Sequence, residues 1–214
     1  MRLADDLYAF PWRMLAENNC NSYLIDAAVR VLIDPGHQHL LGELVGSLAS
    51  LTIRPDDIDL VIGTHAHPDH IEALQSFSSS SSMITMGELE YRSFQKAAQL
   101  FGFRLEPDFL LTEGTLKVGP TVLEVILTPG HSPGSICLYW PARKALFAGD
   151  VIFEQGVGRT DLPGGSGNQL KESIKRISSL DIELLLPGHG NIVRGKKEVK
   201  RNFSLVEEMY FGYL

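Results

Sequence analysis

Short apolar runs that end in glycine, proline, threonine or aspartate dominate the first third of the chain. Residues 21–26 (NSYLID) and 29–36 (VRVLIDPG) are β-rich runs closed by turn residues, which indicates strands. Residues 39–50 (HLLGELVGSLAS) have apolar positions at helical spacing, so they predict a helix. Residues 58–64 (IDLVIGT) are almost continuously apolar, and we expect a central strand that is covered on both faces.

The rest of the chain separates into helical and extended patterns. The stretch from residue 115 to 153 reads as a series of strands with a hairpin turn at 141–144 (PARK). A polar loop is expected at the serine run, residues 76–83. Helices are predicted over 70–77, 88–102, 168–180 and 196–211, and a further strand is predicted over 182–190.

Length and composition indicate one domain spanning residues 1–214. A chain of 214 residues with 44% hydrophobic and 21% charged residues can bury a sizeable core, unlike the polar, highly charged chains that stay disordered. The N-terminus lacks the apolar core of a secretory signal, and no run approaches the roughly 18 apolar residues of a membrane span. We therefore expect a cytoplasmic protein without a membrane partner.

The net charge and the cysteine content limit the kinds of binding partner that we expect. A formal net charge of −7 argues against nucleic acid, because binding to phosphates usually requires a field of lysine and arginine. The two cysteines, Cys20 and Cys137, are too few for a disulfide scaffold and are expected as reduced thiols. A small-molecule substrate is the expected partner, and the pattern indicates no particular oligomeric state.

Histidines gather where apolar strands end. Five of the seven histidines, and one aspartate, follow such runs, which is hard to explain as a set of independent accidents. Imidazole and carboxylate are common nitrogen and oxygen ligands of metals, and strand ends form a rigid rim that can hold them. A bend at Pro68 lets the last two residues of THAHPDH turn towards a second position, so the pattern predicts two metal sites. The candidates are His65, His67, His70, His131, His189 and Asp150, with Asp69 beside His70.

The stretch THAHPDH, residues 64–70, resembles the T-H-x-H-x-D-H signature of the metallo-β-lactamase-fold hydrolases. The resemblance continues in order through TPGHSPGS, FAGDVIF and LLPGHG, and so covers nearly the whole chain. It implies an α/β fold, a four-layer αββα sandwich with a dinuclear site at one edge between two sheets. It also implies metal-assisted hydrolysis by a metal-bridging hydroxide.

The same resemblance assigns the ligands. Two Zn²⁺ ions per chain are implied, and iron or manganese can use the same nitrogen and oxygen donors. Asp69 would ligate and orient, and Asp150 would fix the spacing of the metals, which makes these two aspartates the implied catalytic residues. One zinc would take His65, His67 and His131, the second Asp69, His70 and His189, and Asp150 would bridge both.

Within this fold the chain resembles the glyoxalase II-like group, which hydrolyses thioesters such as hydroxyacylglutathione. The resemblance rests on residues 156–166 (GVGRTDLPGGS), where Arg159 and Asp161 either belong to a loop that supports the site or form a local ion pair. The C-terminal helical domain of full-length glyoxalase II is not expected here. Three alternatives are a lactone hydrolase of the same fold, a metal-stabilised binding module, and a persulfide dioxygenase with one iron on His65, His131 and Asp150.

Two further features have two interpretations each. Asp34 either orients a ligating imidazole or is a turn aspartate before Pro35. A basic run, represented by Lys197, either binds an acidic thioester close to the His189 loop or is a solvated helix face. His37 and His39 are expected as exposed loop residues.

Overall fold

The computed structural model describes residues 1–214 except residues 15, 78–81 and 102, and in the helix over 88–101 it leaves the side chains of 97–101 undescribed. The strands of the described residues are β1 (Arg2–Ala4), β2 (Leu7–Phe10), β3 (Ser22–Ile25), β4 (Val31–Ile33), β5 (Leu60–Gly63), β6 (Met83–Gly87), β7 (Phe109–Leu111), β8 (Gly114–Val118), β9 (Thr121–Leu127), β10 (Ile136–Trp140), β11 (Ala145–Gly149), β12 (Ile152–Phe153), β13 (Gly156–Val157), β14 (Leu184–Pro187) and β15 (Val193–Arg194). The helices are α1 (Leu41–Ala49), α2 (Pro68–Ile71), α3 (Leu74–Phe77), α4 (Glu88–Phe101), α5 (Gly167–Ser178) and α6 (Lys196–Tyr210), with 3-10 turns η1 (Gln38–Leu40), η2 (Pro55–Asp57) and η3 (Pro141–Arg143).

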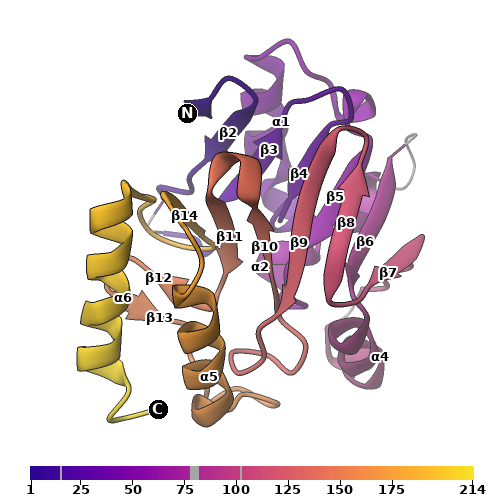
Figure 1. Cartoon of the computed structure of the whole chain (residues 1–214). Coiled ribbons are helices and arrows are strands. Elements are labelled where there is room, and N and C mark those ends of the chain that lie inside the picture. The colour runs from indigo at the N-terminus through magenta and orange to yellow at the C-terminus, as the bar shows by residue number, and fades with distance from the viewer. Residues whose placement is uncertain (15, 78–81, 102) are drawn as a thin grey trace.

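Two sheets carry the fold (Figure 1). Among the described residues, the first sheet has the order β1-β2-β3-β4-β5-β6-β7 and the second has the order β15-β14-β11-β10-β9-β8. Strands β4 to β7 are parallel in the first sheet, and β11 is parallel to β14 in the second. The carboxyl ends of parallel strands meet at one edge of a sheet, which is where α/β folds place their sites.

Alternating side chains on the strands define four layers. In β10, Leu138 and Trp140 belong to the core between the two sheets, whereas Cys137 and Tyr139 pack with the apolar faces of α5 and α6. The first sheet is arranged in the same way: its other face packs against α1, α3 and α4, for example Leu32 among the side chains of those helices. The layers are therefore helix, sheet, sheet and helix, which confirms the predicted αββα sandwich.

The central strand β5 behaves as the apolar pattern predicts. All four of its residues are buried, since Leu60 and Ile62 face the second sheet and Val61 faces the helices. The short strands β1, β2, β6, β7, β13 and β15 were not predicted.

The helix expected over 70–77 is instead two four-residue helices, α2 and α3. The break has a local cause: the Ala73 amide donates to the Gly36 carbonyl at 2.9 Å rather than continuing the helical ladder. The serine run expected as a loop falls largely on residues 78–81, outside the described part of the chain.

Within the described residues, no helix combines the length and the apolar character needed to cross a membrane.

Candidate metal centre

The carboxyl ends of strands from both sheets bring the candidate ligands together. The loop after β5 carries two of the histidines, α2 carries an aspartate and a histidine, and the loops after β9, β11 and β14 carry one candidate each. The side chains that converge are His65, His67, Asp69, His70, His131, Asp150 and His189. Loops and a helix that follow strands of both sheets therefore contribute side chains to this one cluster.

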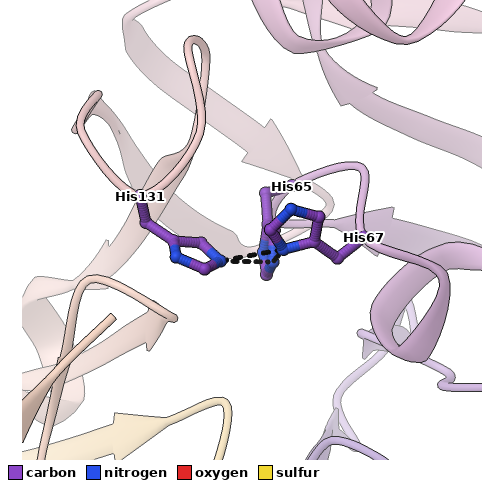
Figure 2. Close-up of side chains that lie close together, drawn as sticks. All are labelled: His65, His67 and His131. Carbon is purple, nitrogen blue, oxygen red and sulfur yellow. Dashed lines mark hydrogen bonds between the residues drawn. The ribbon is translucent and has the colours of Figure 1, made fainter. Parts of the chain in front are cut away.

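The first group consists of three imidazoles whose nitrogens point at one another (Figure 2). His65 Nε2 lies 3.0 Å from His67 Nδ1, and His131 Nε2 lies 3.2 Å from the first of these nitrogens and 2.9 Å from the second. Nitrogens bound to one tetrahedral zinc at roughly 2.0–2.1 Å are separated by about 3.3 Å. The three nitrogens therefore fit one metal ion with only a small outward adjustment.

The second group combines two imidazoles with a carboxylate. His189 Nε2 lies 3.3 Å from His70 Nε2 and 3.3 Å from Asp69 Oδ2. These separations match the same expected spacing of ligand atoms. Asn18 holds the aspartate from outside, because its side-chain amide donates to Asp69 Oδ2 at 2.6 Å.

Asp150 lies between the two groups. Its Oδ1 is 3.2 Å from His70 Nε2, and its Oδ2 is 3.4 Å from His189 Nε2 and 3.5 Å from His131 Nε2. Oδ1 is buried and has no hydrogen bond of acceptable geometry within the described residues. A buried carboxylate oxygen without a donor is costly, and a bound cation would satisfy it. The donor set therefore fits bound metal cations, with Asp150 placed between the two groups of ligands.

The outward nitrogens of three rings are already occupied. His70 Nδ1 lies 2.9 Å from Asp34 Oδ2, His131 Nδ1 lies 2.8 Å from the carbonyl oxygen of Arg159, and His65 Nδ1 lies 3.2 Å from the Thr64 hydroxyl. Such partners fix the orientation of an imidazole and leave the inward nitrogen free to bind a metal.

Asp34 has a wider role than a turn residue. It is fully buried, and besides contacting His70 it accepts hydrogen bonds from both the amide and the hydroxyl of Thr64, each at 2.8 Å. Its backbone lies in the left-handed region at φ 54°, where aspartate and asparagine are tolerated better than most residues. Asp34 thus connects the start of the His65 loop to helix α2.

Burial and charge give the two groups different protonation. Burial lowers the pKa of His67 to about 4 and the pKa of His65 well below its ordinary value. Burial opposes charge on His70 and His189 as well, but contacts with Asp150 outweigh it, so the pKa of His70 is raised strongly and that of His189 is raised to about 9. The second group is therefore a set of ion pairs in which a cation can replace protons.

A buried acid that the sequence did not single out ties the two ligand loops together. Glu90, in the first turn of α4, accepts from the Ala66 amide at 2.9 Å and from the Gly134 amide at 2.7 Å. Burial raises its pKa in spite of these donors. The available signal was its spacing four residues before Phe94, which puts an acid on the buried face of an amphipathic helix.

We expect Glu90→Gln to destabilise the protein by about 1–3 kcal/mol, because an amide NH₂ would face a backbone donor and leave one buried amide without an acceptor. Loosening of both loops should also weaken zinc binding. Urea unfolding and competition with a chromogenic chelator would measure the two effects.

Glu88→Gln is the matched control, since Glu88 lies on the same helix in an exposed ion pair with Arg92 and its loss should change stability by less than about 0.5 kcal/mol. Equal effects of the two substitutions would show that Glu90 does not hold the loops.

For Arg159 and Asp161, the structure agrees in part with each of the two interpretations. Their side chains form an exposed ion pair with contacts of 2.7 and 2.8 Å. The backbone of the same loop nevertheless reaches the centre, through the Arg159 carbonyl that holds His131. The loop therefore contacts the cluster through its main chain and not through the charged groups.

Lys197 does not lie near the cluster, which favours the second interpretation of the basic run, a solvated helix face. β15 runs antiparallel to β14 and pairs Arg194 with Leu184, so the chain has returned to the start of β14 before α6 begins. At about 3.3 Å per residue, β14 alone spans roughly 10 Å from Leu184 to Pro187, and His189 lies beyond its far end. Lys197 is an exposed residue of the first turn of α6.

Comparison with known proteins places this geometry in a family. Residues 15–189 match the metallo-beta-lactamase superfamily. The chain is 36% identical over 185 residues to a probable metallo-hydrolase of Methanocaldococcus jannaschii, covering 80% of this chain and 88% of that protein. It is 30% identical over 203 residues to the hydroxyacylglutathione hydrolase GloC of Haemophilus influenzae, covering 87% and 92%.

A solved structure of a related protein has a similar fold. A protein crystallised in a di-iron-bound form superposes with a TM-score of 0.72 at 28% identity, covering 96% of this chain and 100% of that one. The family match spans the chain from the N-terminal loop to the last candidate ligand, His189, and the fold and the clustered histidines and aspartates agree with it. The chain belongs to the metallo-beta-lactamase superfamily.

Proposed function

We propose that this protein is a dinuclear zinc hydrolase that cleaves thioesters of the hydroxyacylglutathione type or related small esters. The observation that carries the proposal is the position of Asp150, between a group of three imidazoles and a second group that adds a carboxylate. A closed structural zinc site needs only four protein ligands, whereas seven ligands around a shared carboxylate suit two ions that keep positions open for water and substrate.

The bound cations would lower the pKa of a water molecule until hydroxide exists at neutral pH, and they would polarise the carbonyl under attack. The chain's own residues supply position and charge. Asp150 holds the two groups at a fixed separation, and Asp34 keeps the His70 ring turned inward. Asp69, fixed by Asn18 and His189, presents a carboxylate where the attacking water would be oriented.

Accessibility favours one direction of approach for the substrate. The His65 and His70 side chains are buried completely, whereas 27% of the His189 side chain and 13% of the Asp69 side chain are exposed. His67 is also partly exposed, so a small ester or thioester would reach the centre from the side on which His67, Asp69 and His189 lie.

The thioester class is supported by the relative from Haemophilus influenzae, whose name states hydroxyacylglutathione hydrolysis. It is supported further by the loop over 156–166, whose Arg159 carbonyl contacts a candidate ligand directly. A loop of this kind next to the ligands is what the resemblance to the glyoxalase II-like group implies.

Hydrolysis of S-lactoylglutathione by the zinc-loaded protein tests the proposal. We expect turnover that is lost when a chelator removes the metal and regained when zinc is returned. A correctly folded, zinc-loaded protein without turnover on this substrate would refute the thioester assignment, and a panel of esters and lactones would then identify the substrate class.

A second candidate function is a persulfide dioxygenase with a single iron on His65, His131 and Asp150. It is favoured by the position of His131 Nε2, which lies 3.2 Å from His65 Nε2 and 3.5 Å from Asp150 Oδ2. The structural relative solved in a di-iron-bound form indicates in addition that a related fold accepts iron. Oxygen consumption with glutathione persulfide by the iron-loaded protein distinguishes this function from thioester hydrolysis.

A further inference from the structure

Three side chains outside the seven-residue cluster also gather in a metal-binding arrangement. One nitrogen from each of His37 and His39 and one oxygen of Glu72 lie within 4.8 Å of one another. His37 Nδ1 lies 2.8 Å from Glu72 Oε2, and the two imidazole rings have centroids 5.0 Å apart. His39 is exposed as expected, whereas His37 is only partly exposed because it contacts Glu72.

The backbone holds the two sides of this group in register. The Gly36 amide donates to the His70 carbonyl at 3.2 Å, and the Ala73 amide donates to the Gly36 carbonyl at 2.9 Å. Glu72 lies between these two anchored positions, so its carboxylate is placed opposite the loop that follows β4. The arrangement depends on main-chain contacts and does not require a metal to form.

The group can tighten around a cation. The His39 side chain is 63% exposed, so a change of rotamer can bring its nitrogen towards the spacing of about 3.3 Å that ligands of one zinc require. Glu17 lies on the same side, with its Oε2 3.9 Å from His39 Nε2, and offers a fourth donor.

The carboxylate is ready to bind a cation. Glu72 Oε2 accepts from the Gln38 amide at 3.1 Å and lies 2.8 Å from His37 Nδ1, so these contacts fix its position. A carboxylate beside two imidazoles selects zinc and similar transition metals over magnesium or calcium, which prefer sites made of oxygen alone.

We propose that His37, His39 and Glu72 form a separate surface site for a divalent transition metal such as zinc, with Glu17 as the available fourth ligand. A cation bound there joins the loop after Asp34 to the segment after His70. Since these two residues contact each other inside the protein, the surface metal would stabilise the support of the main centre from outside.

Zinc content at equal free zinc tests this proposal without using activity. The wild-type holoenzyme, equilibrated in a zinc buffer, should bind one zinc more per chain than the double variant His37→Ala/His39→Ala. The single variant His39→Ala should bind the additional ion at least about tenfold more weakly. Raising zinc beyond saturation of the main centre should increase the melting temperature of the wild type and not that of the double variant.

The comparison is a difference between variants, so it does not depend on how many ions the main centre holds or on the proposed hydrolysis. Glu208→Gln, which removes an exposed carboxylate of α6, is the control and should match the wild type. Equal zinc content in the wild type and in the double variant would overturn the proposal. So would equal zinc affinity in His39→Ala, whose exposed side chain can be removed without unfolding the protein.

Discussion

Asp69→Asn is expected to reduce thioester hydrolysis by about 10³-fold or more while leaving the fold intact. Asparagine keeps the shape of the side chain but removes the negative charge that faces His189 Nε2 at 3.3 Å. Loss of a charged ligand at a dinuclear centre removes several kcal/mol of transition-state stabilisation, and each 1.4 kcal/mol corresponds to about tenfold in rate. Steady-state kinetics with S-lactoylglutathione, at saturating zinc, measures the effect.

His67→Ala should have the same effect, since it removes one of the three imidazoles of the first group. Lys197→Ala is the control: the structure places this lysine far from the centre, so both kcat and KM should stay at their wild-type values. Circular dichroism and the melting temperature establish that each variant is folded. Retained turnover in both Asp69→Asn and His67→Ala would mean that the ligand assignment is wrong.

Asp34→Ala is expected to destabilise the metal-free protein by about 3–5 kcal/mol. The substitution removes the buried acceptor of two Thr64 hydrogen bonds and leaves the buried His70 without one of its two carboxylate partners. Removing one partner of a buried charged pair is costly, because the remaining group stays buried without the contact that offset its desolvation. Urea unfolding of chelator-treated protein gives the free energy of unfolding directly.

Two further variants separate the causes. Asp34→Asn keeps the shape and tolerates the left-handed backbone, so it should cost less than the alanine variant and lose mainly the charge contact with His70. Gln155→Ala places alanine at a similar φ of 55° on the surface, and should be close to neutral. If Asp34→Ala were as mild as Gln155→Ala, Asp34 would be an ordinary turn residue.

The sequence predicts this fold well where apolar runs are long and end in recognisable turn residues. Strands such as β5 and β9 and helices such as α5 follow from periodicity, and the order of the four histidine and aspartate motifs points to the sandwich. The candidate ligands could be listed from the sequence because each of them lies in the loop or short helix that follows a strand. Asp34 could be singled out for the same reason, as a carboxylate at the end of β4.

Other features depend on contacts between distant segments, which no local pattern contains. Glu90 holds two ligand loops only because α4 packs under both of them, and Asn18 reaches Asp69 across 51 positions of sequence. Lys197 follows His189 by eight positions but lies at the other end of β14, because β15 reverses the chain. Distance along the sequence was a poor guide to distance in space at that point.

The most direct test of the account is the crystal structure of protein loaded with two equivalents of zinc, with an anomalous difference map recorded at the zinc absorption edge. We expect two strong peaks on either side of Asp150. One would be bound by His65, His67 and His131, and the other by Asp69, His70 and His189. A single peak, or two peaks without Asp150 between them, would contradict the dinuclear centre on which the proposed function rests.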